Sequence, residues 1–298
     1  MAARLIKKQV GGMEIIGFSV AGVETVVAVP ELNVCFDAGR APTEIISIDN
    51  LCLTHGHMDH AAGLAYYLSQ RGFIGTSPGR IIVPRPLAQP VQALMAVWAD
   101  IEGHHSAGQI LAVEPGQDVT LRRNLLVRPF AVDHGAAALG YSVIEVRHKL
   151  KPEYRDLNGP QLVELKKKGV EIQEYLQVPL VAYCGDTALG AFLDDPMVRD
   201  ARVLVVECTF YDADHVTRAR AGRHIHVRDL PELMRRVKSP DVLLTHVSQR
   251  TDLRVAMRLA AEVLPPDDHA RITFLMDRPA RPRRPHAAVD RPAATSGK

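Results

Sequence analysis

The chain has 298 residues, of which 47% are hydrophobic and 23% are charged. These fractions are near the averages of soluble globular proteins, so collagen, a coiled coil and wholesale disorder are excluded. The formal net charge is +2. Residues 277–298 hold six Lys or Arg and two Asp, so residues 1–276 carry 30 − 32 = −2. Binding of an anionic polymer must therefore depend on local basic patches and not on the overall charge.

The N-terminal region shows no signal for a membrane or for export. Its apolar stretches are interrupted by Glu14, Glu24 and Glu31, far short of the ~20 uncharged residues that a membrane span needs. The opening sequence MAARLIKKQVGG is not followed by the apolar stretch and small-residue cleavage site of a signal peptide. We therefore expect no transmembrane helix and a cytoplasmic location.

The predicted elements alternate between strands and helices. Short apolar runs bounded by Gly, Pro and Asn predict strands over 24–30, 32–37, 45–48 and 50–55. Amphipathic helices are predicted over 62–72 and 87–103, followed by strands over 109–113, 118–123, 125–132, 139–146, 178–186 and 201–210. Helices over 227–238 and 251–264 then alternate with strands over 241–246 and 270–276. This order predicts a layered α/β domain with covered sheet faces.

The domain is expected to span residues 1–276. From residue 277 onward Pro and Arg alternate with Ala, and no periodic apolar pattern remains. We therefore expect a disordered tail over 277–298.

The cysteines point to neither a metal knuckle nor a disulfide framework. They lie far apart, without C-x-x-C spacing, at Cys35, Cys52, Cys184 and Cys208. Three of the four lie in apolar runs, so we expect small buried hydrophobic side chains.

The strongest local signal is the sequence THGHMDH at residues 54–60, directly after a predicted strand and before a predicted helix. Alternate residues of an extended segment point the same way, so His55 and His57 can converge on one metal ion. Asp59 and His60, at the turn into the helix, can reach a neighbouring ion. Imidazole and carboxylate groups suit Zn²⁺, with Mn²⁺ or Fe²⁺ as other candidates.

Three further strand ends offer ligands for such a binuclear site. His134 ends PFAVDHG, Asp186 follows a buried run in AYCGDT, and His246 ends LLTH. Each follows an apolar run that would hold it rigidly at one edge of a sheet. We infer two sets of ligands bridged by Asp186. The first set is His55, His57 and His134, and the second is Asp59, His60 and His246.

These motifs resemble, in order and spacing, those of the metallo-β-lactamase superfamily. Within it, the chain is similar to the ribonuclease Z family of tRNA 3′-processing endonucleases, in its short plant and cyanobacterial-like form. The similarity extends over residues 13–275 and includes KLKPEYRDLNGPQLVELKKKGVEI, ECTFYDADH, GRHIH and THVSQR. It implies an αββα four-layer sandwich with two divalent metal ions at the sheet edge. It also implies precursor tRNA as the substrate, cut after the discriminator base, and a homodimer.

The same resemblance implies a catalytic pair, Glu207 and His224, beside the scissile phosphate. His224 would stabilise or protonate the leaving oxygen, and Glu207 would orient it. His226 is a near neighbour that could exchange roles with His224 or contact RNA. Asp59 would bind one metal and accept the proton of the attacking water.

RNA contacts are expected from a Lys-rich segment and from the last motif. Residues 147–168 hold seven Lys or Arg against three acids, and the long bacterial-type clamping arm, rich in Gly and Pro, is not evident there. The alternative for this segment is a solvated helix face. The motif THVSQR retains Ser and Arg but lacks the aromatic residues usual in the family. The expected contacts are Lys149, Lys151, Arg155, Ser248 and Arg250.

Two other functions remain open from the sequence. The same metal core could serve a small-molecule phosphodiesterase, an arylsulfatase-like enzyme or a lactonase, because one fold hosts many chemistries. GRHIH together with Glu207 favours phosphodiester cleavage, since an alkoxide leaving group needs an acid. A catalytically silent RNA-binding scaffold is disfavoured, because seven polar ligands without a metal would be costly to bury.

Overall fold

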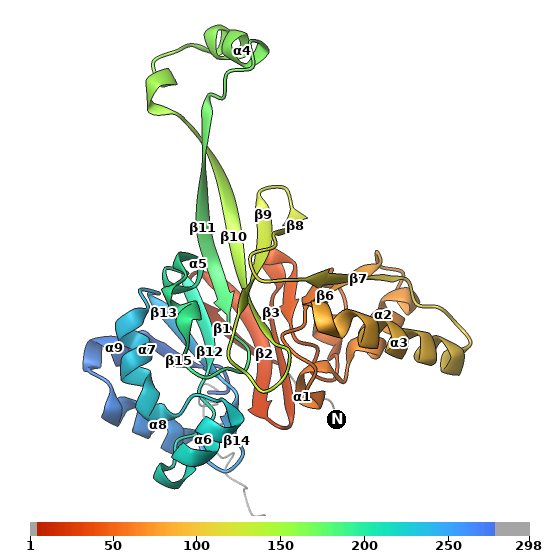
Figure 1. The fold of residues 1–298 in the computed structure, drawn as a ribbon, viewed down its shortest axis with the longest axis vertical. Coiled ribbons are helices and arrows are strands. Elements are labelled where there is room, and N and C mark those ends of the chain that lie inside the picture. Colours follow the sequence, from red (N-terminus) through yellow and green to blue (C-terminus); the bar gives the residue numbers. More distant parts are fainter. Residues whose placement is uncertain (1–4, 278–298) are drawn as a thin grey trace, which may run out of the picture.

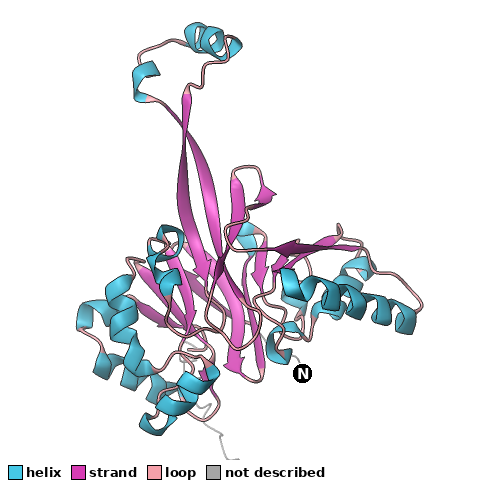
Figure 2. Cartoon of the chain, viewed as in Figure 1, coloured by secondary structure: helices cyan, strands magenta, loops and turns pink. Residues whose placement is uncertain are grey.

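Two β-sheets pack face to face, and helices cover the outer face of each (Figures 1 and 2). The structure, a computed structural model, describes residues 5–277. It has the four αββα layers that the sequence predicts. The predicted tail over 277–298 lies, apart from Asp277, outside the described residues.

The first sheet comes mainly from the N-terminal part of the chain and has the order β1-β2-β3-β4-β5-β6-β7, with β14 beside β2. Its strands are β1 (Ile6–Val10), β2 (Met13–Ala21), β3 (Glu24–Val29), β4 (Val34–Phe36), β5 (Asn50–Cys52), β6 (Gly79–Pro84), β7 (Gly108–Val113) and β14 (Val247–Ser248). Helices α1 (Met58–Ala61), α2 (Leu64–Phe73) and α3 (Arg85–Glu102) accompany this sheet.

The second sheet has the order β15-β13-β12-β11-β10-β9-β8. Its strands are β8 (Val119–Arg122), β9 (Leu125–Ala131), β10 (Leu139–Leu150), β11 (Gln173–Tyr183), β12 (Val203–Glu207), β13 (Asp241–Thr245) and β15 (Ile272–Phe274). Its helices are α5 (Pro196–Arg199), α6 (Val216–Gly222), α7 (Leu230–Arg236), α8 (Leu253–Val263) and α9 (Pro266–Ala270). Among the described residues no helix has the length and apolar character to cross a membrane.

Successive side chains of a buried strand point to opposite faces of its sheet, so each strand contributes to two layers of the core. On β12, Val203 and Val205 pack into the core between the sheets, whereas Leu204 and Val206 pack under the outer helices. Both faces are thus apolar, which explains the continuous apolar run in the sequence. All four cysteines are buried and free, as predicted.

The predicted strand over 45–48 is wrong. The segment contains the end of a 3₁₀ turn, η2 (Thr43–Ile45), and its isoleucines are buried under α2. Its carbonyl groups accept hydrogen bonds from side chains of that helix. Tyr67 donates to the carbonyl of Ile48, and Arg71 donates to the carbonyls of Ile46 and Ile48. Because these groups are satisfied locally, the apolar segment needs no strand partner.

The Lys-rich segment over 147–168 lies mostly outside the two packed sheets (Figure 1). It lies in a projecting arm, in which β10 and β11 continue as a two-stranded ribbon far beyond the sheet and carry α4 (Gly159–Lys167) at the tip (Figure 1). Pairing persists to Leu150 opposite Gln173. Most side chains of the outer ribbon are exposed, so no apolar alternation marks these strands in the sequence. The long Gly- and Pro-rich clamping arm is not evident in the sequence, and the arm observed here is a ribbon of two strands that carries one short helix.

Candidate metal centre

Four strand ends meet at one edge of the two sheets. His55 follows β5, His134 follows β9, Asp186 follows β11 and His246 follows β13. The end of β11 approaches β5 closely, because a Cβ atom on Gly185 would lie 2.8 Å from Thr54 Cγ2. Gly185 also has a φ of +61°, which glycine adopts without strain.

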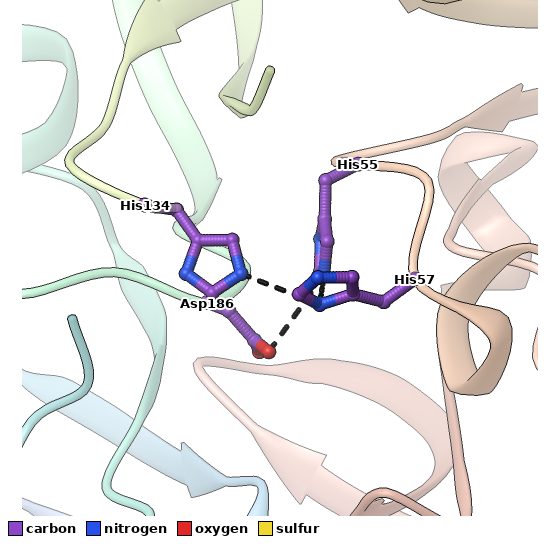
Figure 3. A group of neighbouring side chains, drawn as sticks. All are labelled: His55, His57, His134 and Asp186. Atoms are coloured by element: carbon purple, nitrogen blue, oxygen red, sulfur yellow. Dashed lines mark hydrogen bonds and ion pairs between the residues drawn. The ribbon is translucent and has the colours of Figure 1, made fainter. Parts of the chain in front are cut away.

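The first group of converging side chains is His55, His57, His134 and Asp186 (Figure 3). Each offers one ligand atom, and these atoms lie within 4.8 Å of one another. His57 Nδ1 is 2.9 Å from His55 Nε2 and 3.4 Å from His134 Nε2. His57 is exposed and the other three are buried, so this group opens to solvent on one side.

The second group consists of Asp59, His60 and His246, and Asp186 reaches it as well. The Nε2 atoms of His60 and His246 lie 3.4 Å apart. Asp186 Oδ2 lies 3.4 Å from His60 Nε2, 3.3 Å from His246 Nε2 and 3.8 Å from His55 Nε2. One carboxylate oxygen therefore faces both groups, which is the position of a bridging ligand.

The rings are oriented by hydrogen bonds from their other nitrogens. Asp37 accepts from His60 Nδ1 at 2.8 Å and from the hydroxyl of Tyr183 at 3.0 Å. Thr54 donates its hydroxyl to Asp37, so its oxygen accepts from His55 Nδ1 at 3.0 Å. These bonds leave the Nε2 lone pairs of His55 and His60 facing the cluster, which is how metal-binding histidines are usually held.

Sequence analysis missed these supporting residues. Asp37 ends the sequence VCFD, a carboxylate directly after a buried strand, which is the same signal that indicated Asp186. Thr209 plays the matching part for His246, whose Nδ1 donates to its hydroxyl oxygen at 2.9 Å. Thr209 in turn donates to Glu207. No local pattern marks Thr209, because its partner lies 37 residues away.

The pKa values of His55, His60 and Asp186 are shifted because these groups are buried close together. Burial and the neighbouring histidine His60 lower the pKa of His55 to about 2. Burial also opposes charge on His60, but Asp186 and Asp37 raise the pKa of that ring well above its ordinary value. Burial likewise opposes charge on Asp186, while His246 and His60 lower its pKa well below the ordinary value. The buried carboxylates of Asp186 and Asp37 next to His60 therefore favour a positive charge at this position.

The donor set fits divalent metal ions. The ring nitrogens of each group lie close to one another and to a carboxylate, and a cation placed among them would be coordinated by all of these atoms. Three imidazoles with a shared carboxylate, and two imidazoles with two carboxylates, match the ligand types of Zn²⁺. The predicted ligands therefore lie together as two adjoining groups.

Glu207 and His224 lie beside the second group. His224 Nδ1 donates to Glu207 Oε1 at 2.7 Å, and ligand-type atoms of His224, Asp186 and His246 lie within 4.8 Å of one another. Glu207 is fully buried and also accepts from the backbone N–H groups of Thr187 and Ile225. Burial opposes charge on His224, but Glu207 raises the pKa of the ring to about 9.

The role expected of His226 is wrong. Its side chain is buried, and both ring nitrogens are engaged by the backbone. Nδ1 accepts from the N–H of Arg228 at 3.1 Å, and Nε2 donates to the carbonyl of Asp212 at 2.9 Å. His226 caps the turn η6 (Val227–Asp229) and is not free to replace His224 or to contact RNA.

An open pocket of about 440 Å³ lies over the cluster. Ser248 and Arg250 line it, together with Arg218 on α6, which sequence analysis did not single out. The arm residues Lys149, Lys151 and Arg155 are remote from this pocket. Leu139, at the start of β10, bonds to the carbonyl of Thr54 beside the cluster, and the ten residues from there to Lys149 span roughly 33 Å.

Comparisons with known proteins agree with this architecture. A family model described as a β-lactamase superfamily domain matches residues 28–247. The chain is 34% identical over 270 residues to "tRNase Z TRZ1" of Arabidopsis thaliana, covering 90% of this chain and 96% of that protein. It is 36% identical over 267 residues to "tRNase Z TRZ2, chloroplastic" of the same plant, covering 84% and 73%.

Solved structures show the same fold at lower identity. The metallo-β-lactamase fold protein YhfI from Bacillus subtilis superposes with a TM-score of 0.60 at 14% identity, over 91% of this chain and 96% of that one. The short form of human tRNase Z superposes with a TM-score of 0.53 at 15% identity, over 83% and 92%. With the plant relatives matched over most of their length and the ligand-type residues gathered at one sheet edge, the chain belongs to the tRNase Z, or ribonuclease Z, family of the β-lactamase superfamily.

Proposed function

We propose that this protein is the endoribonuclease that cuts precursor tRNA after the discriminator base. The observation that carries the proposal is the hydrogen-bonded pair Glu207 and His224 beside two adjoining groups of ligand-type side chains. Similarity to plant tRNase Z proteins over most of the chain supports precursor tRNA as the substrate.

Two divalent ions complete the site, with Zn²⁺ as the first candidate and Mn²⁺ or Fe²⁺ as alternatives. His55, His57 and His134 would hold one ion, and Asp59, His60 and His246 the other. Asp186 would bridge them, because its Oδ2 atom faces both groups. When bound, two such ions polarise the phosphodiester and activate the attacking water.

The side chains supply the proton transfers. Asp59 lies at the pocket surface, where the backbone N–H of Gly22 donates to its Oδ2 at 2.8 Å, and it is placed to accept a proton from the attacking water. His224 is placed to donate a proton to the oxygen that leaves with the 3′ trailer. Glu207 holds His224 through Nδ1, so the proton is delivered from Nε2.

RNA affinity is assigned to two regions. Ser248 and Arg250 line the pocket over the cluster and would contact the RNA near the cut. Lys149, Lys151 and Arg155 lie on the arm, where Lys149 and Arg155 are exposed, and would contact phosphates far from it. Because these contacts are electrostatic, affinity should fall with salt.

The functional unit is proposed to be a homodimer in the cytoplasm. Large apolar side chains are exposed on α2 and α3, a face that a second copy would cover. They are Tyr66, Phe73, Leu94, Val97, Trp98 and Ile101.

The test is to incubate the zinc-loaded protein with a 3′-extended precursor tRNA and, separately, with bis(p-nitrophenyl) phosphate, and to map any cut to the nucleotide. We expect cleavage directly after the discriminator base, lost in His224→Ala and retained in His269→Ala, a control on α9. Hydrolysis of the small diester without any cleavage of precursor tRNA would instead assign the site to small phosphodiesters.

A further inference from the structure

A second open pocket, of about 470 Å³, lies at the opposite end of the sheets from the metal centre. Arg202 lines it and directly precedes β12, whereas Glu207 ends that strand beside the metal centre. Five residues of strand separate the two positions by roughly 17 Å. The pocket therefore shares no residue with the site described above.

Arginine side chains dominate the rim of this pocket. They are Arg122 and Arg123 at the end of β8, Arg147 on β10, and Arg202. The carboxylates in the lining are Glu31 and Glu145, so four positive charges face two negative ones. Glu145 pairs with Arg147 at 2.7 Å.

The other three arginines have no such partner. Within residues 5–277, neither Arg122 nor Arg123 nor Arg202 forms an ion pair. All three are exposed, and the lining of the pocket also includes buried apolar side chains such as Met13 and Leu125. Guanidinium groups that form no ion pair are suited to phosphate groups, which they bind through paired N–H donors.

The pocket is continuous with the arm. The β8–β9 turn is fixed against the base of the arm, because the N–H of Val146 donates to the carbonyl of Asn124 at 2.9 Å. Figure 1 shows this hairpin pointing the same way as the arm and beside its base. Along β10, Arg147 and Lys149 are two residues apart on one face of the strand, each with one carboxylate neighbour, Glu145 and Glu174 respectively.

We propose that the arginine pocket, defined by Arg122, Arg123, Arg147 and Arg202, binds phosphates of the RNA backbone at a distance from the cut. The proposal rests on the proposed function and adds a substrate-binding surface to it. An extended polyanion fits better than a small anion, because three arginines that form no ion pair within the described residues are spread around an open pocket at the base of the arm. The pocket makes no base contacts in this scheme, so it contributes affinity without sequence preference.

The test measures RNA binding directly, without cleavage. The affinity of fluorescently labelled mature tRNA is measured by anisotropy at several salt concentrations between about 0.05 and 0.2 M. We expect the triple variant R122A/R123A/R202A to bind at least about tenfold more weakly at the low end. The slope of log affinity against log salt should shrink by about 0.9 for each phosphate that the variant no longer binds. The control R228A/R235A/R254A removes the same charge from η6, α7 and α8 and should change affinity less than about twofold.

The variant R122K/R123K/R202K shows whether a loss of RNA affinity comes from the lost charges or from a disturbed fold. Lysine keeps the positive charges, so the salt slope should remain close to that of the wild type. Thermal unfolding midpoints check that each variant is folded, and R122A/R202A replaces the triple variant if that one does not fold. Binding by the alanine variant that equals the control, or a wild type that does not bind tRNA at all, would overturn the proposal. Cleavage of precursor tRNA by the wild type is scored separately, so loss of the proposed function is distinguishable from loss of this surface.

Discussion

His224 and Glu207 form a hydrogen bond of 2.7 Å between Nδ1 and Oε1, and Glu207 is fully buried while His224 reaches the pocket over the metal centre. The carboxylate is held by backbone N–H groups, so it has little freedom to move. This pair presents Nε2 of His224 toward the site with its direction fixed. A leaving alkoxide needs such an acid, whereas a leaving group that is already stable as an anion does not.

The first prediction follows from that difference. Glu207→Gln should lower kcat on precursor tRNA by about 10²–10⁴-fold, because the neutral amide neither orients nor charges His224 as the carboxylate does. Hydrolysis of bis(p-nitrophenyl) phosphate should fall much less, since p-nitrophenolate leaves without protonation. Steady-state rates on both substrates give the comparison.

Asp59→Ala serves as the comparison variant in these rate measurements. It should abolish turnover of both substrates, because Asp59 acts on the water and the metal and not on the leaving group. Equal losses in Glu207→Gln on both substrates would remove the leaving-group role from the pair. A circular dichroism spectrum confirms that both variants are folded.

A second prediction concerns Asp37, which contacts no substrate. Asp37→Asn should weaken metal binding by about 10–100-fold, because His60 loses the carboxylate that orients its ring. Metal content after dialysis and calorimetric titration with Zn²⁺ measure this effect. Asp118→Asn, an exposed acid paired with Arg128, serves as the control and should leave metal affinity unchanged. Undiminished affinity in Asp37→Asn would show that the site binds metal without this carboxylate.

The ligand-type residues that converge in the structure could be located from the sequence, but the contacts of the residues that support them could not. THGHMDH concentrates four ligand-type side chains in seven residues, and His134, Asp186 and His246 each follow an apolar strand. Both signals are local. Asp37 also follows an apolar strand, but its part in the site depends on contacts with His60 and with Tyr183, 146 residues away, that exist only once the chain has folded.

The arm shows the same limit for the fold. Buried strands such as β12 can be predicted from apolar runs in the sequence, because both faces of the strand contact other layers. The outer halves of β10 and β11 contact mainly each other and solvent, so their residues need only pair through the backbone. Such pairing leaves no hydrophobic period in the sequence, and a polar ribbon then looks like a loop. The turn over 45–48 is the converse case, in which apolar residues are buried without being a strand.

The third prediction tests the arm. Replacing Lys149, Lys151 and Arg155 by alanine should raise KM for precursor tRNA and reduce its salt dependence, with kcat nearly unchanged, because these residues lie far from the cut. The control K166A/K167A/K168A removes three charges from the end of α4 and the residue after it, at the tip of the same arm. A larger effect in the control would move the contact to α4, and no effect in either variant would leave the arm as a solvated surface.

The last prediction concerns stability away from the site. Arg71 is 1% exposed and donates to Asp49, whose side chain is 39% exposed. Partial burial opposes charge on Asp49, but hydrogen bonds from Asn33, Arg71 and Ser77 lower its pKa below the ordinary value of 3.8. A carboxyl group with a depressed pKa in the folded state stabilises the fold above its unfolded pKa, and that contribution disappears as the pH falls through the folded pKa.

Asp49→Asn should therefore lower the free energy of unfolding by about 1 kcal/mol at neutral pH, a value at the low end for a charged partner because solvent screens the pair. The difference from the wild type should shrink below about pH 4. Urea unfolding at pH 7 and at pH 3 measures it, with Asp194→Asn, from the more exposed pair with Arg236, expected to stay within about 0.5 kcal/mol of the wild type. A difference that persists at low pH would mean that Asp49 acts through the shape of its hydrogen bonds and not through its charge.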